Sequence, residues 1–514
     1  MSAEHVHAPI TEIEKHGVEF IPSAERDATP FDLFRMAFGG ANTFSTAVLG
    51  ALPIMLGLSF QQGAIAILIG VVIGALLLTP MSLFGQITGT NNAVSSGAHF
   101  GVHGRIVGSF LSLLTAIAFF SLSVWSSGDA LVAGGRRLIG APESKIALAL
   151  VYGLFAVIVL VICIYGFRFM LLVNRIAVSS ATLLFALGIF AFVGVFDPNY
   201  PGHFALDALG HRPAGLLPAM VSAILLAMSN PLSFGAFLGD WTRYIPTESS
   251  KPRVMAAAFL SQIATLVPFG FGLCTATVVA AKAPEFIHNY DYVGGLMAVS
   301  PGWYFLPLCL IALIGGLSTG TTSLYGTGLD MSSVFTRLSR VAATILIGVL
   351  SIAFIFIGRF MANLVGSVST FAVLIVTCTL PWMVIMTIGI FTRRGFYLAD
   401  DLQVFTRRQE GGAYWFSHGW NWRAMGAWVP SAALGLCFVN VPDQFVGPLG
   451  RLAAGIDLSI PVTMGSAAFF YLAALNLFPE PATVFGPLGP RWVRAGEQGH
   501  EDIRVGKPKP ATTP

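Results

Sequence analysis

Apolar blocks of about 20 residues alternate with short polar segments along almost the whole chain. A helix of this length crosses the hydrocarbon core of a bilayer, which is roughly 30 Å thick. We therefore expect an all-α integral membrane protein. The pattern predicts twelve membrane-spanning helices near residues 33–58, 62–85, 105–133, 146–167, 171–196, 214–239, 254–281, 302–328, 340–357, 361–391, 421–441 and 458–478.

Two of these spans contain residues that interrupt a helix. The first holds the run GGAN at 39–42, and the sixth holds Asn230-Pro231 and Gly235 at a comparable depth. Proline lacks a backbone donor, and each glycine weakens a helix by about 1 kcal/mol. Main-chain groups freed at membrane depth are tolerated only where they line a cavity or are buried in protein. The alternative interpretation is close packing at the glycines and a simple kink at the proline.

The two interruptions lie five spans apart, which indicates two inverted five-helix repeats around a central site. Spans eleven and twelve are then additions outside the repeat. The predicted parts are a cytosolic N-terminal segment 1–32, a first repeat 33–196, a second repeat 214–391, a cytosolic loop 392–420, the last two spans within 421–478, and a cytosolic tail 479–514.

Charge is scarce and unevenly distributed. Only 10% of the residues are charged, whereas soluble proteins carry about 25%. If the N-terminus is cytoplasmic, 21 of the 28 Lys and Arg residues fall on the cytoplasmic side, as the positive-inside rule requires. The N-terminal segment lacks the apolar core of a signal peptide. We expect a multi-pass protein of the cell membrane with both termini in the cytoplasm.

The loop 392–420 combines basic and aromatic residues. We interpret it as a positive-inside loop with an aromatic belt at the membrane interface, with contact to anionic lipid as the alternative. The residues are Arg393, Arg394, Arg407, Arg408, Tyr414, Trp415 and Trp420.

The middle third of each predicted span contains no Asp, Glu, Lys, Arg or His. A charge there is costly and usually marks a proton relay or a site for a charged solute. We therefore expect a neutral solute held by hydrogen bonds. A coupling ion is then more easily Na⁺ on carbonyl and hydroxyl oxygens than H⁺ on a carboxylate, although protons stay an alternative.

Other classes of protein fit the sequence poorly. HExxH and GxSxG motifs and paired intramembrane aspartates, which would indicate a membrane enzyme, are absent, and so is a loop resembling an ion-channel filter. No basic cluster suggests nucleic acid. The five cysteines all lie in apolar blocks, unlike metal ligands or a disulfide framework. We expect no cofactor apart from a coupling ion and no obligate protein partner.

Several segments resemble the nucleobase–cation symporter family of purine–cytosine permeases and hydantoin and allantoin transporters. They are FGGANTFSTAVLGAL in the first span, GDWTRYIP at the end of the sixth, STGTTSLYGTGL in the eighth, and LQVFTRRQEGGAYWFSHGWNWRAMGAWVP after the tenth. The resemblance covers nearly the whole chain. It implies a LeuT-type fold, in which spans 1, 2, 6 and 7 form a bundle that moves against a scaffold of spans 3, 4, 8 and 9.

The resemblance also implies a sodium site between the interruption in the first span and the eighth span. The implied ligands are the carbonyls near Gly39 and Asn42, the carbonyl of Gly315, and the hydroxyls of Ser318 and Thr319. The last three residues are three and four positions apart and so share one helix face. The alternative is close packing through small residues, with the hydroxyls bonded back to their own helix.

Family members stack a flat heterocycle between aromatic side chains and bind its edge through amides. The corresponding residues here are Asn42, Phe119, Ser123, Asn230, Phe234 and Thr322. Ser123 and Thr322 replace amides of the family pattern, so each offers one hydroxyl in place of a two-pronged group. At the end of the sixth span Asp240 and Arg243 are spaced for an ion pair, which we interpret as an inner gate or a helix anchor.

The sequence thus predicts a secondary active importer of a small neutral nucleobase-like heterocycle, of the cytosine, purine or uracil class, coupled to a cation by alternating access. A transporter of allantoin, a hydantoin or a thiamine-precursor pyrimidine is the alternative within transport. A membrane sensor or non-transporting scaffold is the alternative from another class.

Overall fold

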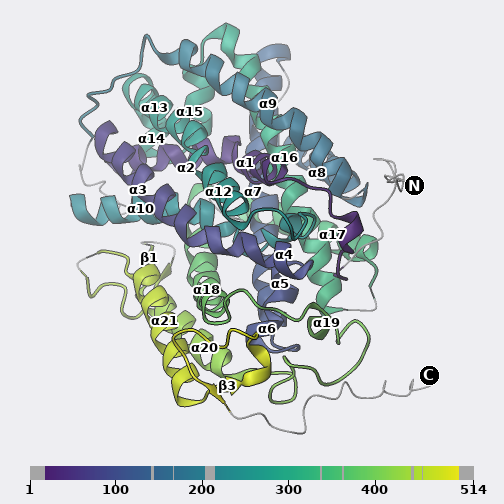
Figure 1. Cartoon of the computed structure of the whole chain (residues 1–514). Helices are drawn as coiled ribbons and strands as arrows, with labels where there is room; N and C mark the ends of the chain where they lie inside the picture. The colour runs from purple at the N-terminus through teal and green to yellow at the C-terminus, as the bar shows by residue number, and fades with distance from the viewer. Residues whose placement is uncertain are drawn as a thin grey trace.

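The computed structural model describes residues 18–140, 144–165, 167–202, 215–335, 338–361, 364–441, 445–453 and 455–496. These residues are predominantly helical (Figure 1). The ends of the predicted terminal segments, residues 1–17 and 497–514, lie outside the described residues.

The longer helices follow the predicted spans closely. They are α1 (Pro30–Ala41), α2 (Phe44–Met55), α3 (Phe60–Leu78), α7 (Ile106–Ile139), α8 (Lys145–Tyr165), α9 (Phe167–Phe192), α10 (Leu216–Ser233), α12 (Lys251–Ile263), α13 (Leu266–Lys282), α16 (Gly302–Val334), α17 (Arg340–Met361), α18 (Leu364–Thr392), α20 (Trp422–Phe438) and α21 (Ser459–Leu477). Among the described residues, nine helices are long and apolar enough to cross a membrane, and Phe44–Met55 and Val341–Ala353 are shorter apolar helices.

Short elements connect these helices. They are η1 (Ser23–Glu25), η2 (Thr79–Met81), α4 (Ser82–Thr88), α5 (Asn92–Ser95), α6 (Gly97–Phe100), α11 (Gly239–Thr242), α14 (Pro284–His288), α15 (Tyr292–Val299), α19 (Ala399–Leu402) and η3 (Ala482–Val484). Strands β1 (Asn440–Val441) and β2 (Phe445–Val446) pair antiparallel between α20 and α21. Strands β3 (Glu480–Pro481) and β4 (Ala495–Gly496) pair in parallel.

Helix α1 begins three residues before the predicted boundary because of a capping box. The Thr29 hydroxyl accepts a hydrogen bond from the Asp32 amide at 3.1 Å, and the Asp32 carboxylate accepts one from the Thr29 amide at 2.9 Å. Pro30 occupies the first helical position, where its missing amide hydrogen costs nothing. The local sequence therefore fixes the start of this helix.

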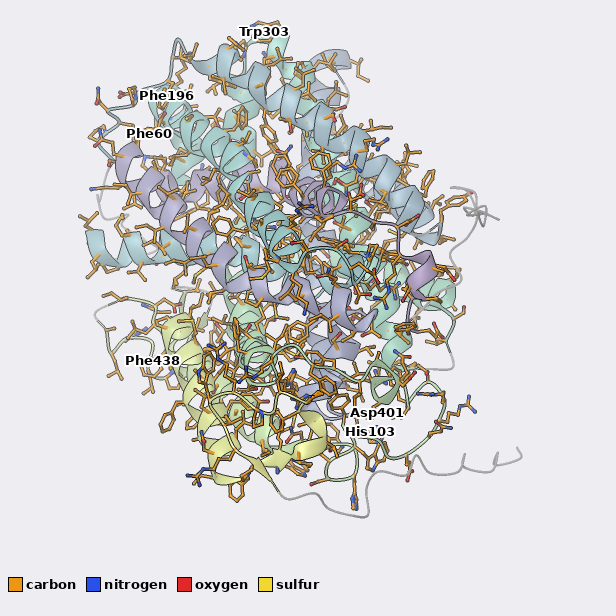
Figure 2. The ribbon with its side chains drawn as sticks, viewed as in Figure 1. Phe60, His103, Phe196, Trp303, Asp401 and Phe438 are labelled. Carbon is orange, nitrogen blue, oxygen red and sulfur yellow. The ribbon has the colours of Figure 1, made fainter. Side chains whose placement is uncertain are left out.

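The long helices pack in two groups. Helix α2 lies against α13, α3 lies against α10, and α1 lies against α12. In the second group α16 packs along α7 and also contacts α8, α9 and α17. The α20–α21 pair packs on α18 at one end of the molecule (Figure 1). Toward another edge, Phe60 at the start of α3 packs edge-on against Phe196 beyond α9, with ring centroids 4.8 Å apart (Figure 2).

Glycines allow α2 and α13 to approach closely. A Cβ atom on Gly50 would lie 2.2 Å from the Phe269 carbonyl oxygen, and one on Gly272 would lie 1.8 Å from the Ala47 carbonyl oxygen. Both neighbours are backbone atoms, so a side chain at either glycine would push the helices apart. Such small-residue contacts are the usual means of tight helix packing within membranes.

The loop after α18 is partly buried, which corrects the expected interfacial position of two of its residues, Arg393 and Tyr414. Arg393 is 1% exposed, and its Nη2 atom lies 2.8 Å from Oε2 of Glu480. Asn421 donates to the other carboxylate oxygen of Glu480 at 2.8 Å. Tyr414, expected in the belt, is also fully buried. Arg393 and Tyr414 therefore tie this loop into the protein and do not face lipid.

The ion pair also involves a segment that the sequence suggested to be a polar tail. Glu480 and the following Val484 are both buried. Burial lowers the pKa of the Arg393 guanidinium, but the Glu480 carboxylate and nearby tyrosines outweigh burial and raise that pKa above its ordinary value. Arg393 is thus charged, and the first part of the tail is folded against the rest of the protein.

We predict that Glu480→Ala lowers the free energy of unfolding by about 3–5 kcal/mol, because it leaves the Arg393 charge buried and unpaired. Glu480→Gln keeps an acceptor for Asn421 and should cost less. Thermal and denaturant unfolding of the detergent-purified protein measures the change, with the exposed Glu285 on α14, changed to Ala, as the control. Equal unfolding of Glu480→Ala and Glu285→Ala would contradict a stabilising role for the pair.

Candidate functional site

The first predicted interruption is a true break between α1 and α2. Helix α1 ends at Ala41, Asn42 leaves the helical region with φ −81° and ψ 66°, and Thr43 is extended with φ −134° and ψ 163°. The Thr43 side chain then caps α2 by accepting from the Thr46 amide at 3.3 Å. The break lies at residues 42–43, so Gly39 and Gly40 are still helical, which refines the predicted position.

Hydroxyl groups meet the carbonyl oxygens at the end of α1. Ser318 Oγ donates to the Gly39 carbonyl at 2.8 Å, and Thr319 Oγ1 donates to the Gly40 carbonyl at 2.7 Å. Thr46 Oγ1 donates to the Ala41 carbonyl at 2.6 Å. Two hydroxyls from α16 and one from α2 therefore pair with three successive main-chain oxygens at the buried end of α1.

Small residues bring α16 this close to the break. A Cβ atom on Gly315 would lie 3.0 Å from Thr43 Cα, and one on Gly316 would lie 1.9 Å from Ser127 Oγ of α7. Gly315, Ser318 and Thr319 thus share the face of α16 that contacts the break, as their spacing predicts. The structure brings these three residues together with Gly39.

Asn42 points its amide toward α9. Its Nδ2 atom donates to Thr182 Oγ1 at 2.9 Å, while its Oδ1 atom is buried without a hydrogen-bond partner among the described residues. On the same helix, the Asn174 side chain reaches Ser318 with Oδ1 3.2 Å from the Ser318 hydroxyl. Asn174 and Thr182 were not predicted from the sequence as part of this site. The available signal was the polar side chains within the apolar span 171–196.

The second interruption follows Pro231. Helix α10 ends at Ser233, residues 234–238 form successive turns, and α11 begins at Gly239. The Phe234 amide donates to the Pro231 carbonyl at 3.1 Å, and the Gly235 carbonyl accepts from Asn92 Nδ2 at 2.8 Å. Tight turns and a side chain from α5 thus satisfy backbone groups that a regular helix would pair.

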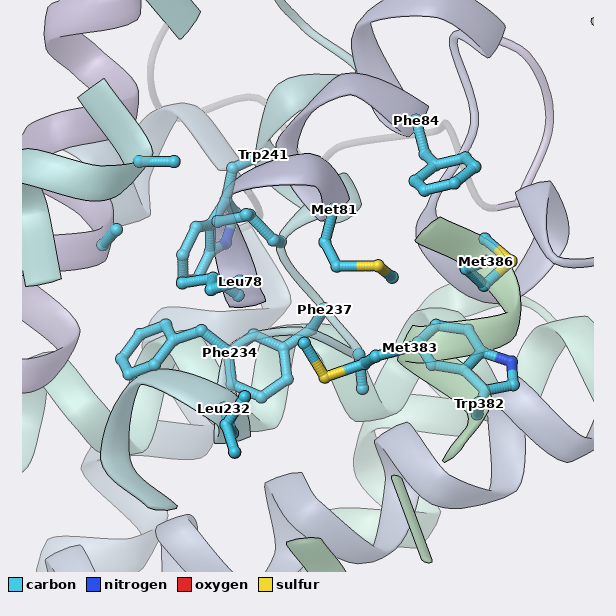
Figure 3. Close-up of a cluster of buried hydrophobic side chains, with 14 of the residues drawn as sticks. Leu78, Met81, Phe84, Leu232, Phe234, Phe237, Trp241, Trp382, Met383 and Met386 are labelled. Atoms are coloured by element: carbon cyan, nitrogen blue, oxygen red, sulfur yellow. The ribbon is translucent and has the colours of Figure 1, made fainter. Parts of the chain in front are cut away.

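Phe234 belongs to an aromatic cluster formed by this turn. Its ring centroid lies 5.4 Å from that of Phe237 and 5.9 Å from that of Trp241 (Figure 3). A Cβ atom on Gly40 would lie 3.1 Å from the Phe234 ring and 3.3 Å from Thr322 Oγ1. The turn after α10, the end of α1 and the middle of α16 therefore meet at one place.

The remaining predicted substrate residues occupy varied surroundings. Asn230 is buried, and its Nδ2 atom has no hydrogen-bond partner among the described residues. Thr322 and Ser123 are buried, but their hydroxyls bond back to carbonyls of their own helices. Phe119 is half-buried, whereas the adjacent Phe120 is fully buried, 3.7 Å from the position of a Cβ on Gly320. The roles of Phe119 and Ser123 stay predictions.

Asp240 and Arg243 lie in the protein interior at the far end of the broken segment. Both are almost completely buried. Arg243 Nη2 lies 3.1 Å from Tyr325 Oη on α16, and a Cβ atom on Gly326 would lie 2.9 Å from Asp240 Oδ2. These residues join α11 to α16, an arrangement suited to holding the two helix groups together at this end.

Comparison with known proteins identifies the family of this chain. The family described as permeases for cytosine and purines, uracil, thiamine and allantoin matches residues 20–462. The chain belongs to this family. It is 23% identical over 472 residues to the putative purine-cytosine permease YxlA of Bacillus subtilis, covering 90% of this chain and 96% of that protein. It is 24% identical over 484 residues to the purine-cytosine permease fcyB of Emericella nidulans, covering 90% and 88%.

A solved structure shows the same fold. Mhp1, a nucleobase-cation-symport-1 family transporter in a closed conformation with bromovinylhydantoin bound, matches with a TM-score of 0.68 and 19% identity over 93% of this chain and 98% of that chain. The predicted helical membrane fold of the LeuT type is supported by this match, whereas the count of twelve spans and the two additional C-terminal helices stay predictions. The chain is a membrane transporter for nucleobase-like solutes and not an enzyme.

We predict that Gly39→Ala destabilises the protein by about 1–3 kcal/mol, because the new methyl group overpacks a full interior. Its Cβ would lie 1.8 Å from Asn174 Oδ1 and 2.5 Å from Val178 Cγ2. Gly426→Ala on α20, where nothing lies within 4 Å, is the control and should be neutral or slightly stabilising. Thermal unfolding in detergent compares the two, and identical unfolding temperatures would contradict the tight contact of α1 with α9.

Proposed function

We propose that this protein is a secondary active importer that couples the entry of a small neutral nucleobase-like heterocycle to sodium by alternating access. The observation that carries the proposal is the pairing of Gly39 and Gly40 carbonyls with the Ser318 and Thr319 hydroxyls at the end of a broken helix. Such neutral oxygens are suitable ligands for a hard cation.

The residues at the break fit a sodium ion chemically. They offer main-chain carbonyl and side-chain hydroxyl oxygens, and Asn42 Oδ1 is buried without a partner among the described residues. The proposed ligand set is the carbonyls of Gly39, Asn42 and Gly315 with the hydroxyls of Ser318 and Thr319. A bound cation would replace the hydroxyl groups as the partner of the carbonyl oxygens. The hydroxyls would keep their protons and turn their oxygen lone pairs toward the cation.

The heterocycle is proposed to bind beside this point, between the two breaks. Phe234 presents an aromatic ring next to Gly40 and Thr322, and Asn230 one turn earlier has a buried amide nitrogen without a partner among the described residues. An aromatic face accepts a flat ring by stacking, and an amide reads its polar edge. Asn230 can thus compensate for the family amides that Ser123 and Thr322 replace.

The proposed membrane arrangement has twelve crossings and both termini in the cytoplasm. The broken pairs α1–α2 and α10–α11 are the first and sixth crossings, and α20 and α21 are the last two, outside the inverted repeat. The bundle would then rock against α7, α8, α16 and α17. Binding of both cation and heterocycle must favour the closed state over singly loaded states, because only a difference in affinity shifts such an equilibrium.

Allantoin, a hydantoin or a thiamine-precursor pyrimidine is the alternative solute class, since Ser123 and Thr322 replace the amides of the family pattern. Uptake by proteoliposomes distinguishes the candidates when cytosine, uracil, adenine, allantoin and hydantoin are compared with sodium or choline outside. Absence of uptake and of counterflow for every heterocycle would instead indicate a sensor or scaffold.

We predict that Thr319→Ala raises the sodium concentration for half-maximal uptake by roughly tenfold or more, because losing one ligand to a charge costs about 1.5–3 kcal/mol. Thr319→Ser keeps the hydroxyl and serves as the matched control. The measurement is uptake against sodium at constant ionic strength. The same sodium dependence in both variants would remove Thr319 from the cation site.

We predict that Phe234→Ala abolishes measurable uptake at low solute concentration while the protein still reaches the membrane. Loss of base–aromatic stacking costs about 1–3 kcal/mol. Phe234→Tyr keeps the ring face and should retain uptake, whereas Phe234→Leu keeps apolar volume without it and should not. Uptake per unit of membrane protein is the readout, and full activity of Phe234→Leu would refute stacking.

A further inference from the structure

Three oxygen atoms from three helices meet around one hydroxyl proton. The Ser318 hydroxyl of α16 lies 2.8 Å from the Gly39 carbonyl oxygen of α1 and 3.2 Å from Asn174 Oδ1 of α9. A serine hydroxyl has a single proton to donate. It can therefore satisfy only one of these two acceptors fully, so at least one of the two oxygens keeps lone pairs for another partner.

The Asn174 side chain is placed firmly at this cluster. It is 1% exposed, and a Cβ atom on Gly39 would lie only 1.8 Å from its Oδ1 atom. The amide tip therefore rests directly on the backbone of α1, and only glycine at position 39 leaves room for it.

Hydrogen bonding accounts for only one end of this buried amide. Asn174 Nδ2 is buried without a hydrogen-bond partner among the described residues. Burying an unpaired amide is unfavourable, and an asparagine within an apolar span usually has a functional partner. Its Oδ1 atom shares the single Ser318 proton with the Gly39 carbonyl, so this oxygen keeps lone pairs that can bind a cation.

We propose that Asn174 supplies its side-chain oxygen as a further ligand to sodium, beside the Gly39 carbonyl and the Ser318 and Thr319 hydroxyls. This inference rests on the proposed sodium coupling. It adds α9 to the helices that the cation joins, since the ligands then come from α1, α9 and α16. A neutral amide oxygen is an ordinary ligand for a hard cation.

Occupancy of such a site can be followed without transport. A ligand that binds only the folded protein raises its unfolding temperature, and the rise follows the logarithm of one plus the ligand concentration divided by Kd. Detergent-purified protein is therefore titrated with NaCl, while choline chloride keeps the ionic strength constant. The variants are Asn174→Ala and Asn174→Asp, and Ser179→Ala, an exposed position on the same helix, is the matched control.

We expect Asn174→Ala to raise the apparent Kd for sodium by about tenfold or more, as for loss of one ligand to a charge. Ser179→Ala should leave this Kd unchanged. Asn174→Asp keeps a side-chain oxygen and should retain the sodium response, with an affinity that increases as pH rises through the titration of the new carboxyl.

Two outcomes would overturn the inference. If the Asn174→Ala protein is less stable at every sodium concentration but keeps the wild-type apparent Kd for sodium, Asn174 is a structural contact only. An Asn174→Asp protein without any sodium response also excludes a ligand at this position. If sodium does not raise the unfolding temperature of the wild type, the proposed sodium coupling itself fails. If sodium stabilises the wild type but the result at Asn174 is negative, only the role of Asn174 fails.

Discussion

Carbonyl groups at the end of a helix that stops inside the protein must find donors there, and this requirement organises the centre of the molecule. A helix leaves its last carbonyls without internal partners, and lipid offers none. Here Ser318 and Thr319 from α16 and Thr46 from α2 donate to the carbonyls that close α1. The break in the first span is therefore stable only because α16 and α2 lie against it.

The same contacts explain why small residues gather at this place. Gly315 and Gly316 let α16 approach α2 and α7, and Gly39 lets the Asn174 amide rest on α1. In the proposed site, a sodium ion and the hydroxyl protons are alternative partners for one set of oxygens. Loading and release then exchange one favourable interaction for another, so neither state leaves a buried carbonyl unpaired.

The opposite kind of polar contact closes the end of the molecule near α18 and α21. Arg393 and Glu480 form a buried ion pair between two segments that precede and follow the last two long helices. A buried pair contributes little net stability but makes the loss of either partner costly, so it specifies how the segments fit together. The α20–α21 pair is thereby attached to α18 through both its loops and its packing.

The sequence determined the features that depend on local chemistry. The length of the apolar blocks predicted the helices. Gly-Gly and Asn-Pro predicted both interruptions to within a few residues, because a missing amide hydrogen or side chain weakens the helix at its own position. The spacing of Gly315, Ser318 and Thr319 likewise predicted a shared face. What the sequence did not reveal was which helix each polar side chain would meet.

Only the tertiary structure decided those partners. Asn42 forms a hydrogen bond with Thr182, 140 residues away, and Ser318 donates to the carbonyl of Gly39, 279 residues away. Arg393 forms an ion pair with Glu480 instead of facing lipid. The physical reason is that lipid is as apolar as a protein core. A membrane helix is therefore apolar on every side, and its hydrophobic pattern reports its length but not which face it turns toward its neighbours.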